Sequence, residues 1–550
     1  MFRFSSTRIW RLLDKSRLQS SVLGRVCGST SPGAGPGPDG GPDGGDGGDG
    51  AMCDAETVFA LSSGHGRCGV AVVRVSGPAS SAALRTMAGL TRGPPPPRRA
   101  LLRTITDPRS GEVLDRGLVL WFPGPHSFTG EDSAEFHIHG GPAVTAAVLH
   151  ALGSLAGVRP AEAGEFTRRA FHAGKLDLTE VEGLGDLIHA ETEAQRRQAL
   201  RQMSGELGRL YQDWSHRLKR CLAHVEAFID FSEDELIEDG VMSQVDGWVC
   251  ALQGEVEGHL KDERRGERLR SGVQVVIAGA TNAGKSSLLN ALCQRPAAIV
   301  SPVAGTTRDV VETALDIGGF PVLLSDTAGL RDGADPVERE GVRRARERVQ
   351  QADLTLVVMD STQLPPDLQQ APALLQDYIS SVLPPQDQDP HIGTVTAVTR
   401  AWVSSASAES PSERCVLVLN KRDLIPERRR VELERALAAA ADPSLPPWCL
   451  LSCHTSAGLQ ELLALLQGSL KALCGDPLSA GPPSLTQARH RAHLQQCVAA
   501  LVQYQRFRDR DLALAAEGVR LALCSLGRIT GRVGAEEILD IIFKDFCIGK

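Results

Sequence analysis

Three features that would quickly assign this chain to a class of protein are missing from its sequence. No apolar run approaches the length needed to cross a bilayer, so we expect no membrane insertion and a soluble protein. The thirteen cysteines are odd in number, scattered and without a CxxC pair, which argues against a disulfide framework or structural zinc and favours a reducing compartment. An excess of positive charge is also missing. The net charge of −8 repels nucleic acid, so any RNA contact must come from local patches such as 196–202 or 261–270, which are explained more simply as solvated helix faces.

The N-terminal 50 residues differ in composition from the rest of the chain. Residues 1–26 carry six Arg or Lys against one acid, Asp14, with serines and bulky apolar residues between them. This is the composition of a mitochondrial transit peptide, and an ordinary basic tail is the alternative. Residues 28–50 form a Gly/Pro/Asp tract that should be disordered. We therefore interpret 1–50 as a presequence and linker of a protein of the mitochondrial matrix.

At 550 residues the chain should form two to four domains. Residues 53–174 contain short β-rich stretches (GVAVVRVSG, GLVLWF, AEFHIHGG) and predict an α+β domain. Residues 175–270 are helical, strands and helices alternate over 271–475, and 476–550 are helical again. This order predicts a multidomain α/β + α fold in which an α/β unit is inserted into a helical domain.

Two apolar stripes define the helical parts, and one stretch interrupts the α/β unit. Spacings of three or four residues place one stripe on a long helix: Leu207, Leu210, Trp214, Leu218, Cys221, Val225 and Phe228. A second stripe near the C terminus contains Leu494, Cys497, Val498 and Leu501. The Pro/Gln/Asp-rich stretch at about 362–412 is expected to be a disordered insertion.

A phosphate-binding loop is predicted at GATNAGKS, residues 279–286, because it follows a predicted strand and precedes an apolar helix start. Its glycines let backbone N–H groups approach phosphates, Lys285 neutralises the β and γ charges, and the Ser286 hydroxyl reaches Mg²⁺. The motifs GTTRD, LLSDTAGL, VLVLNKRD and LLSCHTSAGL follow in the order of a Ras-like GTPase. Thr307 is expected to give Mg²⁺ a second hydroxyl, and Asp326 to lie in the outer shell of the ion.

The last two motifs predict guanine recognition. The Asp423 carboxylate can accept from both guanine N1–H and the exocyclic amine, a donor pair that adenine lacks. Asn420 and Lys421 frame the ring, and the backbone near Ser452 can meet the guanine carbonyl, although this loop reads SCH where SAK is common. The predicted contacts to GTP are Gly279, Asn282, Ala283, Gly284, Lys285, Ser286, Ser287, Ser301, Gly305, Thr306, Thr307, Asp326, Thr327, Ala328, Gly329, Asn420, Lys421, Asp423 and Ser452.

The residue after DTAG raises a mechanistic question. Ras-type enzymes hold a water-orienting Gln there, whereas this chain holds Leu330, which cannot orient water. Another acid or amide must do so, and something must neutralise charge on the leaving phosphate. By proximity the candidate acids are Asp332, Asp335, Glu338 and Glu340, and the residues alone do not choose among them.

Two further groups of residues have competing interpretations. Cys547 is near the carboxyl end, but a prenylation box does not end in a residue such as Lys550, so a lipid anchor is disfavoured. Two interpretations of Cys547 remain, a thiol packed in the core and a nucleophile. His137 and His139 form an HxH pair, yet spacing places no third ligand, so structural histidines are preferred to a metal site.

Taken together, the Leu after DTAG, the TNAGKSSLLN loop, SFTGEDSAEFHIHGG, GEFTRRAFHAGKLDL and the terminal CIGK resemble the MnmE/TrmE family of tRNA uridine-modification GTPases, in its mitochondrial form. The resemblance runs from about Glu56 to Lys550. It implies a Ras-like P-loop G domain at 271–475, inserted in a helical domain (175–270 and 476–550). A folate-binding domain at 53–174, which also dimerises, precedes them.

The resemblance also implies a reaction. With an FAD-dependent partner of the MnmG/GidA type, the homodimer would modify C5 of the wobble uridine in mitochondrial tRNAs. The added group would be of the 5-taurinomethyl or 5-carboxymethylaminomethyl type. Its carbon would come from a tetrahydrofolate, in the 5,10-methylene or 5-formyl form.

Residue by residue, the resemblance implies roles that spacing does not. It makes Glu338 the water-positioning acid, beside Lys285 and Cys547 as catalytic residues, with the Cys547 thiolate adding to C6 of uracil to activate C5. A K⁺ ion would supply the charge that an arginine finger supplies elsewhere. Its ligands would be Asn282, Ser301, Val303 and Thr306. The folate contacts would be Arg74, Glu135, Lys175 and Lys550.

Two other functions remain as alternatives. One is a GTP-dependent switch for mitochondrial ribosome assembly without chemistry of its own, which tetrahydrofolate binding would argue against. The other is a folate-dependent one-carbon transferase with a vestigial G domain, which is disfavoured because all five nucleotide motifs are intact.

Overall fold

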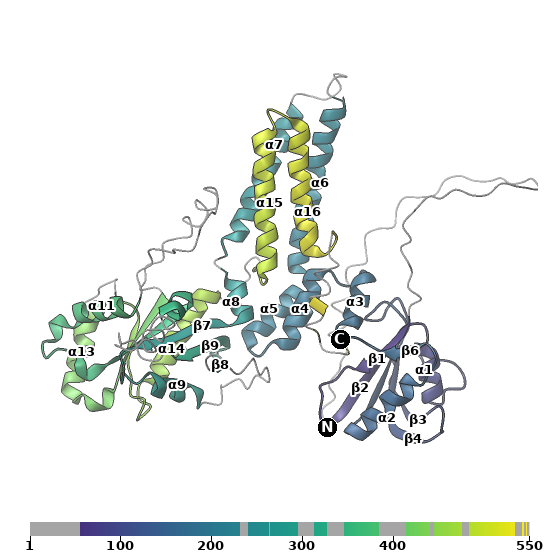
Figure 1. The fold of residues 1–550 in the computed structure, drawn as a ribbon, viewed down its shortest axis with the longest axis horizontal. Coiled ribbons are helices and arrows are strands. Elements are labelled where there is room, and N and C mark those ends of the chain that lie inside the picture. The colour runs from purple at the N-terminus through teal and green to yellow at the C-terminus, as the bar shows by residue number, and fades with distance from the viewer. Residues whose placement is uncertain are drawn as a thin grey trace, which may run out of the picture. The chain divides into compact units, whose positions relative to one another are not determined.

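The computed structural model describes most of the chain and forms three folded parts (Figure 1). No helix among the described residues is long and apolar enough to cross a membrane. The transit-peptide interpretation of residues 1–50 lies outside the described part. The described residues are 56–231, 240–262, 264–294, 313–326, 346–383, 414–439, 445–475, 483–533, 542–543, 546 and 549.

The N-terminal part is a six-stranded sheet with the order β3-β4-β5-β2-β1-β6. Alternation along β5 places Ala134, Phe136 and Ile138 in the core and Glu135 and His137 on the other face. Helices α1 and α2 pack on the core face. The three predicted strand segments are confirmed as β2, β4 and β5. The elements are β1 (Thr57–Leu61), β2 (Cys68–Ser76), α1 (Ser80–Met87), β3 (Leu101–Thr106), β4 (Val113–Phe122), β5 (Ser133–Gly140), α2 (Pro142–Gly153), β6 (Val158–Pro160) and α3 (Glu165–His172).

The helical part contains a bundle made from two distant segments of the chain. Helices α6 (Glu206–Phe231) and α7 (Gly240–Leu260) pack against α15 (Ala488–Phe507) and α16 (Leu512–Thr530), as Figure 1 shows. Both predicted stripes face the bundle core. Its buried members from these stripes are Leu207, Trp214, Leu218, Cys221, Val225, Leu494, Cys497, Val498 and Leu501.

Three shorter helices join this bundle to the rest: α4 (Leu178–His189), α5 (Glu193–Met203) and α8 (Arg265–Ser271). Asp177 and Thr192 begin α4 and α5 with capping boxes, which satisfy free N–H groups at the helix ends. A buried polar cluster then ties α4 to α15, since Glu182 contacts both Arg489 and His490 at 2.7 Å. The helical part is therefore held together across the inserted unit.

The inserted α/β unit is a second six-stranded sheet with the order β12-β11-β10-β7-β9-β8, parallel except for β8. Strands β10 and β11 are buried along their length, as expected for a parallel sheet covered on both faces. Ligands of such sheets bind at the carboxyl ends of the strands. The elements are β7 (Val273–Gly279), α9 (Lys285–Cys293), β8 (Thr313–Ile317), β9 (Phe320–Asp326), β10 (Leu354–Asp360), η3 (Ser361–Gln363), η4 (Leu368–Gln370), α11 (Ala371–Val382), β11 (Cys415–Asn420), η6 (Arg422–Leu424), α13 (Glu427–Ala439), β12 (Trp448–Leu450) and α14 (Leu459–Cys474).

One prediction for this unit is wrong in part. The stretch 362–412 was expected to be disordered, but its N-terminal part, up to residue 383, holds η4 and the twelve-residue helix α11. Ala371, Leu375, Ile379 and Val382 recur at helical spacing and are buried against the sheet, so the apolar period outweighs the surrounding Pro and Gln residues. Residues 384–413 lie outside the described part.

The described residues near the C terminus return to the first two parts. Phe543 and Phe546 pack in one cluster with Leu178 and Val181 of α4. The Ser62 hydroxyl, just after β1, donates to the Gly549 carbonyl at 2.8 Å. The tail is thus anchored on both sides of Cys547, which itself lies outside the described residues.

Candidate functional site

The predicted phosphate-binding loop connects β7 to α9 in the inserted unit. Gly279, Asn282 and Gly284 all have positive φ angles, so the chain turns tightly before the helix begins. Lys285 is buried, and its Nζ donates to the Ala280 carbonyl at 2.9 Å. Burial lowers the pKa of Lys285. The N-terminal end of α9 therefore offers a cation and free N–H groups to an anion.

A candidate magnesium position lies beside this loop. The Ser286 hydroxyl donates to Oδ2 of Asp326, at the end of β9, at 2.7 Å. The other carboxylate oxygen of Asp326, Oδ1, is buried and has no hydrogen-bond partner within the described part of the chain. A hydroxyl and a carboxylate side by side are the hard oxygen groups that surround Mg²⁺, so these two residues fit the ion.

The residues predicted to recognise guanine lie together at the ends of β11 and β12. The Ser452 hydroxyl donates to Oδ1 of Asp423 at 2.5 Å, which holds the carboxylate in place. The Asn420 amide donates to the Ala283 carbonyl of the phosphate loop at 2.9 Å and accepts from the Cys453 N–H at 3.3 Å. The base-recognition motif is thereby connected to the phosphate-binding loop.

Gly284 is the residue that permits this connection. It has a φ of +100°, and a Cβ at this position would lie 2.0 Å from Nδ2 of Asn420. Only glycine lets the loop backbone pass so close to the amide.

Two residues of this site were not predicted from the sequence. Asp360, at the end of β10, forms a 2.6 Å ion pair with Lys421, and the Ser361 hydroxyl donates to the Asn420 carbonyl at 2.5 Å. Burial alone would raise the pKa of Asp360, but Lys421 and Thr362 lower it below its usual value. The sequence feature that could have identified Asp360 is an acid at the carboxyl end of an apolar strand, the position that Asp326 occupies in β9.

The predicted nucleotide residues divide into two sets. The structure brings together the phosphate loop from Gly279 to Ser287, Asp326 and the recognition residues Asn420, Lys421, Asp423 and Ser452. The remaining predicted residues lie outside the described part of the chain, and so do the candidate acids and the C-terminal pair. They are Ser301, Val303, Gly305, Thr306, Thr307, Thr327, Ala328, Gly329, Leu330, Asp332, Asp335, Glu338, Glu340, Cys547 and Lys550.

Two of the residues predicted to contact folate, Arg74 and Glu135, lie on the sheet face opposite α1 and α2. Arg74 on β2 pairs with Glu135 on β5 at 3.0 Å, and its guanidinium lies over the rings of Phe128 and Phe166, at 5.4 and 5.8 Å from their centroids. Burial alone would raise the pKa of Glu135, but His137 and Arg74 lower it. Lys175 follows α3 and lies beside Gly130, where an added Cβ would be 3.5 Å from the Lys175 Cε.

The HxH residues contact separate carboxylates. His137 Nε2 lies 3.1 Å from Glu135, and His139 Nδ1 lies 2.8 Å from Asp115. No group of three or more metal-ligating side chains occurs among the described residues. Hydrogen bonding therefore accounts for both imidazoles.

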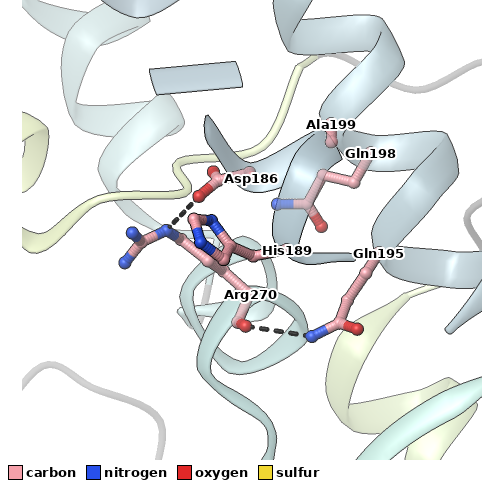
Figure 2. Close-up of a pocket in the computed structure, with 6 residues that line it drawn as sticks. All are labelled: Asp186, His189, Gln195, Gln198, Ala199 and Arg270. Carbon is pink, nitrogen blue, oxygen red and sulfur yellow. Dashed lines mark hydrogen bonds and ion pairs between the residues drawn. The ribbon is translucent and has the colours of Figure 1, made fainter. Parts of the chain in front are cut away.

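A polar cavity of about 430 Å³ lies away from the phosphate loop, between α4, α5 and the end of α8 (Figure 2). Arg270 donates to Asp186 at 2.7 Å, and its carbonyl accepts from the Gln195 amide at 3.1 Å. Burial raises the pKa of Asp186 despite this contact. Since Arg270 precedes β7 by three residues, the cavity marks the point where the chain enters the inserted unit.

Comparison with known proteins gives an independent result. The family model described as "GTP-binding protein TrmE N-terminus" matches residues 57–175, and the "MnmE helical domain" model matches residues 178–547. The chain is 65% identical to the mitochondrial 5-taurinomethyluridine-tRNA synthase subunit GTPB3 of Danio rerio over 495 residues, covering 90% of this chain and 93% of that protein. The protein of the same name from Homo sapiens is 57% identical over the same shares.

Bacterial relatives match over nearly their whole length. The tRNA modification GTPase MnmE of Rhodospirillum rubrum is 48% identical over 509 residues, which cover 90% of this chain and 99% of that protein. The order of the matched segments agrees with the fold, in which a Ras-like unit interrupts the helical part. The chain belongs to the MnmE/TrmE family.

Proposed function

We propose that this protein is a K⁺-stimulated GTPase that, with an FAD-dependent partner, modifies C5 of the wobble uridine of mitochondrial tRNAs. GTP hydrolysis follows from membership of the family, and a mitochondrial location follows from the similarity to the mitochondrial relatives. The observation that carries the proposal is the connected nucleotide site, in which Asn420 links base recognition to the phosphate loop. A site assembled in this way argues against a vestigial G domain.

A few side chains are proposed to stabilise the charge that develops on the phosphates during GTP hydrolysis. Lys285 would neutralise charge on the β- and γ-phosphates, and Ser286 would bind Mg²⁺ together with Thr307, which lies outside the described part, with Asp326 in the outer shell of the ion. Bound Mg²⁺ and K⁺ supply positive charge where negative charge develops on the phosphates. Asn282, with a φ of +64° in the loop, is the described residue proposed to bind K⁺. Its proposed co-ligands, and the water-positioning Glu338, lie outside the described part.

The N-terminal sheet is proposed to bind tetrahydrofolate, the one-carbon donor. Glu135 provides a carboxylate for the donor edge of a pterin, and Arg74 provides a guanidinium for a glutamate tail. Both side chains are partly buried, and the Arg74 guanidinium lies over two aromatic rings. Cation, anion and rings on one sheet face fit a ligand of this kind. Lys175 and Lys550 complete the proposed contacts.

Cys547 is proposed as the nucleophile that adds to C6 of the uracil, which activates C5 toward the one-carbon unit. Support comes from the residues on either side of it. Phe546 packs on α4, and Gly549 accepts a hydrogen bond from Ser62, which follows β1 of the proposed folate domain. We expect Cys547→Ser to abolish modification while GTP hydrolysis continues. A variant that modifies tRNA normally would return Cys547 to the role of a packed thiol.

The potassium proposal is tested by hydrolysis rates in KCl and NaCl at equal ionic strength. The wild-type rate should be much lower in NaCl, and Asn282→Ala should hydrolyse GTP at similar, low rates in both salts. Equal wild-type rates in the two salts would remove the K⁺ proposal.

The folate proposal is tested separately by calorimetric titration with tetrahydrofolate. We expect binding by the wild type, little or none by Arg74→Ala, and normal binding by Arg103→Ala, which removes an exposed arginine from β3 of the same sheet. Binding that survives Arg74→Ala would move the folate site elsewhere. No binding by the wild type would favour a GTP switch without one-carbon chemistry.

A further inference from the structure

Helix α11 contains a tyrosine that contacts the phosphate-binding loop. The hydroxyl of Tyr378 accepts a hydrogen bond from the Ala280 N–H at 2.9 Å and donates one to the Val358 carbonyl of β10 at 2.8 Å. Ala280 is the second residue of the loop. The span that the sequence suggested to be a disordered insertion thus supplies a direct contact to the phosphate-binding loop.

The contact lies at the point where β7 leaves the sheet. The parallel pairing of β7 with β10 ends with Gly279 opposite Val358. Beyond it the chain turns into the loop, and the two strands can no longer satisfy each other's backbone groups. The tyrosine hydroxyl bridges these groups, so that neither is left unpaired in a largely buried position.

Gly279 gives a second observation of the same arrangement. It has a φ of +149°, and an added Cβ would lie 2.2 Å from the Val358 carbonyl oxygen and 3.1 Å from the Tyr378 hydroxyl. Glycine is therefore required for strand, loop and hydroxyl to meet. Burial raises the pKa of Tyr378, which keeps the hydroxyl protonated and able to donate.

From Ala280 the contact continues to the catalytic lysine. The Ala280 carbonyl accepts from Lys285 Nζ at 2.9 Å and from the Ala283 N–H at 3.3 Å. Ala280 therefore donates its N–H to Tyr378, and its carbonyl accepts from the loop residue Ala283 and from Lys285. A shift of Ala280 would displace the groups that bind phosphate.

We propose that Tyr378 is a positioning residue for the phosphate-binding loop, acting through the Ala280 backbone to set nucleotide affinity. The proposal rests on GTP binding at this loop and extends it to α11. Since the Tyr378 hydroxyl contacts the backbone of the loop, its effect should fall on affinity for both GDP and GTP. Turnover at saturating GTP should change little, which is the kinetic pattern of a uniform binding contribution.

The test compares two full-length variants of α11. Tyr378→Phe removes only the hydroxyl. Ile379→Val, the matched control, removes one methyl group from the next residue of the helix. Ile379 packs in the core and makes no hydrogen bond to Ala280 within the described part of the chain. Both variants are checked for folding by circular dichroism and titrated with a fluorescent GDP analogue.

We expect Tyr378→Phe to weaken GDP binding by about tenfold, the effect of losing one buried hydrogen bond, with turnover at saturating GTP within about twofold of the wild type. Ile379→Val should bind GDP like the wild type. Unchanged affinity in Tyr378→Phe, or equal losses in both variants, would overturn the proposal. A wild type that fails to bind GDP would instead refute the function on which it rests.

A measurement on the wild type alone keeps the proposal testable if Tyr378→Phe does not fold. Amide hydrogen exchange in the nucleotide-free protein should show the Ala280 N–H to be strongly protected. Exchange of this amide at the rate of an unstructured peptide would overturn the assignment.

Discussion

Substitution of Glu182 by Gln should open the junction between the two halves of the helical part. The Glu182 carboxylate is buried and contacts Arg489 and His490 at 2.7 Å. Burial alone would raise its pKa, but these two partners lower it, so the group is charged in the folded protein. Removing the charge leaves Arg489 without its buried counter-ion. Breaking a buried pair in this way costs about 3–5 kcal/mol.

The matched control is an ion pair of the same length at the surface. Glu226 on α6 contacts Arg520 on α16, also at 2.7 Å, and also joins the two halves of the bundle, but its side chain is 42% exposed. Water already solvates both groups, and many such pairs contribute nothing measurable. Glu226→Gln should therefore have no detectable effect.

Hydrogen exchange followed by mass spectrometry measures this difference locally, which matters because a multidomain chain has no single free energy of unfolding. Peptides of α4 and α15 should exchange about 100-fold to several thousand-fold faster in Glu182→Gln and at the wild-type rate in Glu226→Gln. Peptides of β7 should be unaffected in both variants. Equal exchange of α4 and α15 in the two variants would refute the reasoning that burial, rather than distance, decides the contribution of these pairs.

Three further predictions concern the nucleotide site and the pH dependence. Asp360→Asn should weaken GDP binding by about tenfold in a fluorescence titration, because Asp360 acts through Lys421. In a Lys421→Met background the same substitution should have no effect. Additive losses in the double variant would contradict this role. Gly284→Ala should abolish GDP binding with an unchanged circular dichroism spectrum, because its Cβ collides with Asn420, and measurable affinity would count against that collision. Burial lowers the pKa of His259 to about 4, whereas an unfolded histidine titrates near about 6.5. The unfolded state therefore binds the proton first, and stability should fall as the pH drops from about 6.5 to 4, by at most about 3 kcal/mol. His259→Gln should flatten this part of the profile when the local stability of α7 is followed by hydrogen exchange corrected for the intrinsic exchange rate at each pH, and an unchanged profile would exclude His259 as its cause.

How far the sequence predicts this structure depends on how local each signal is. The phosphate loop, Asp326 and Asp423 are recognised because each motif is contiguous and follows an apolar strand. The long helix α6 is predicted because its stripe repeats every three or four residues. These features need no knowledge of distant parts of the chain.

The features that were missed depend on contacts between distant residues. Glu182 and His490 are 308 positions apart, and no local pattern pairs them. Tyr378 lies in a stretch whose Pro and Gln residues conceal the period of α11, and it contacts a loop 98 residues earlier. Asp360 follows a strand as Asp326 does, but it lies outside the five motifs. Tertiary packing, which a single sequence does not display, decided the role of each.

The most direct test of the proposed function is mass spectrometry of nucleosides from mitochondrial tRNA. Cells that lack the protein are compared with cells that regain the wild type or Lys285→Ala, which removes the ammonium proposed to neutralise charge on the phosphates. The C5 substituent of the wobble uridine should be lost without the protein, return with the wild type and stay absent with Lys285→Ala. Unchanged modification in cells that lack the protein would contradict the account.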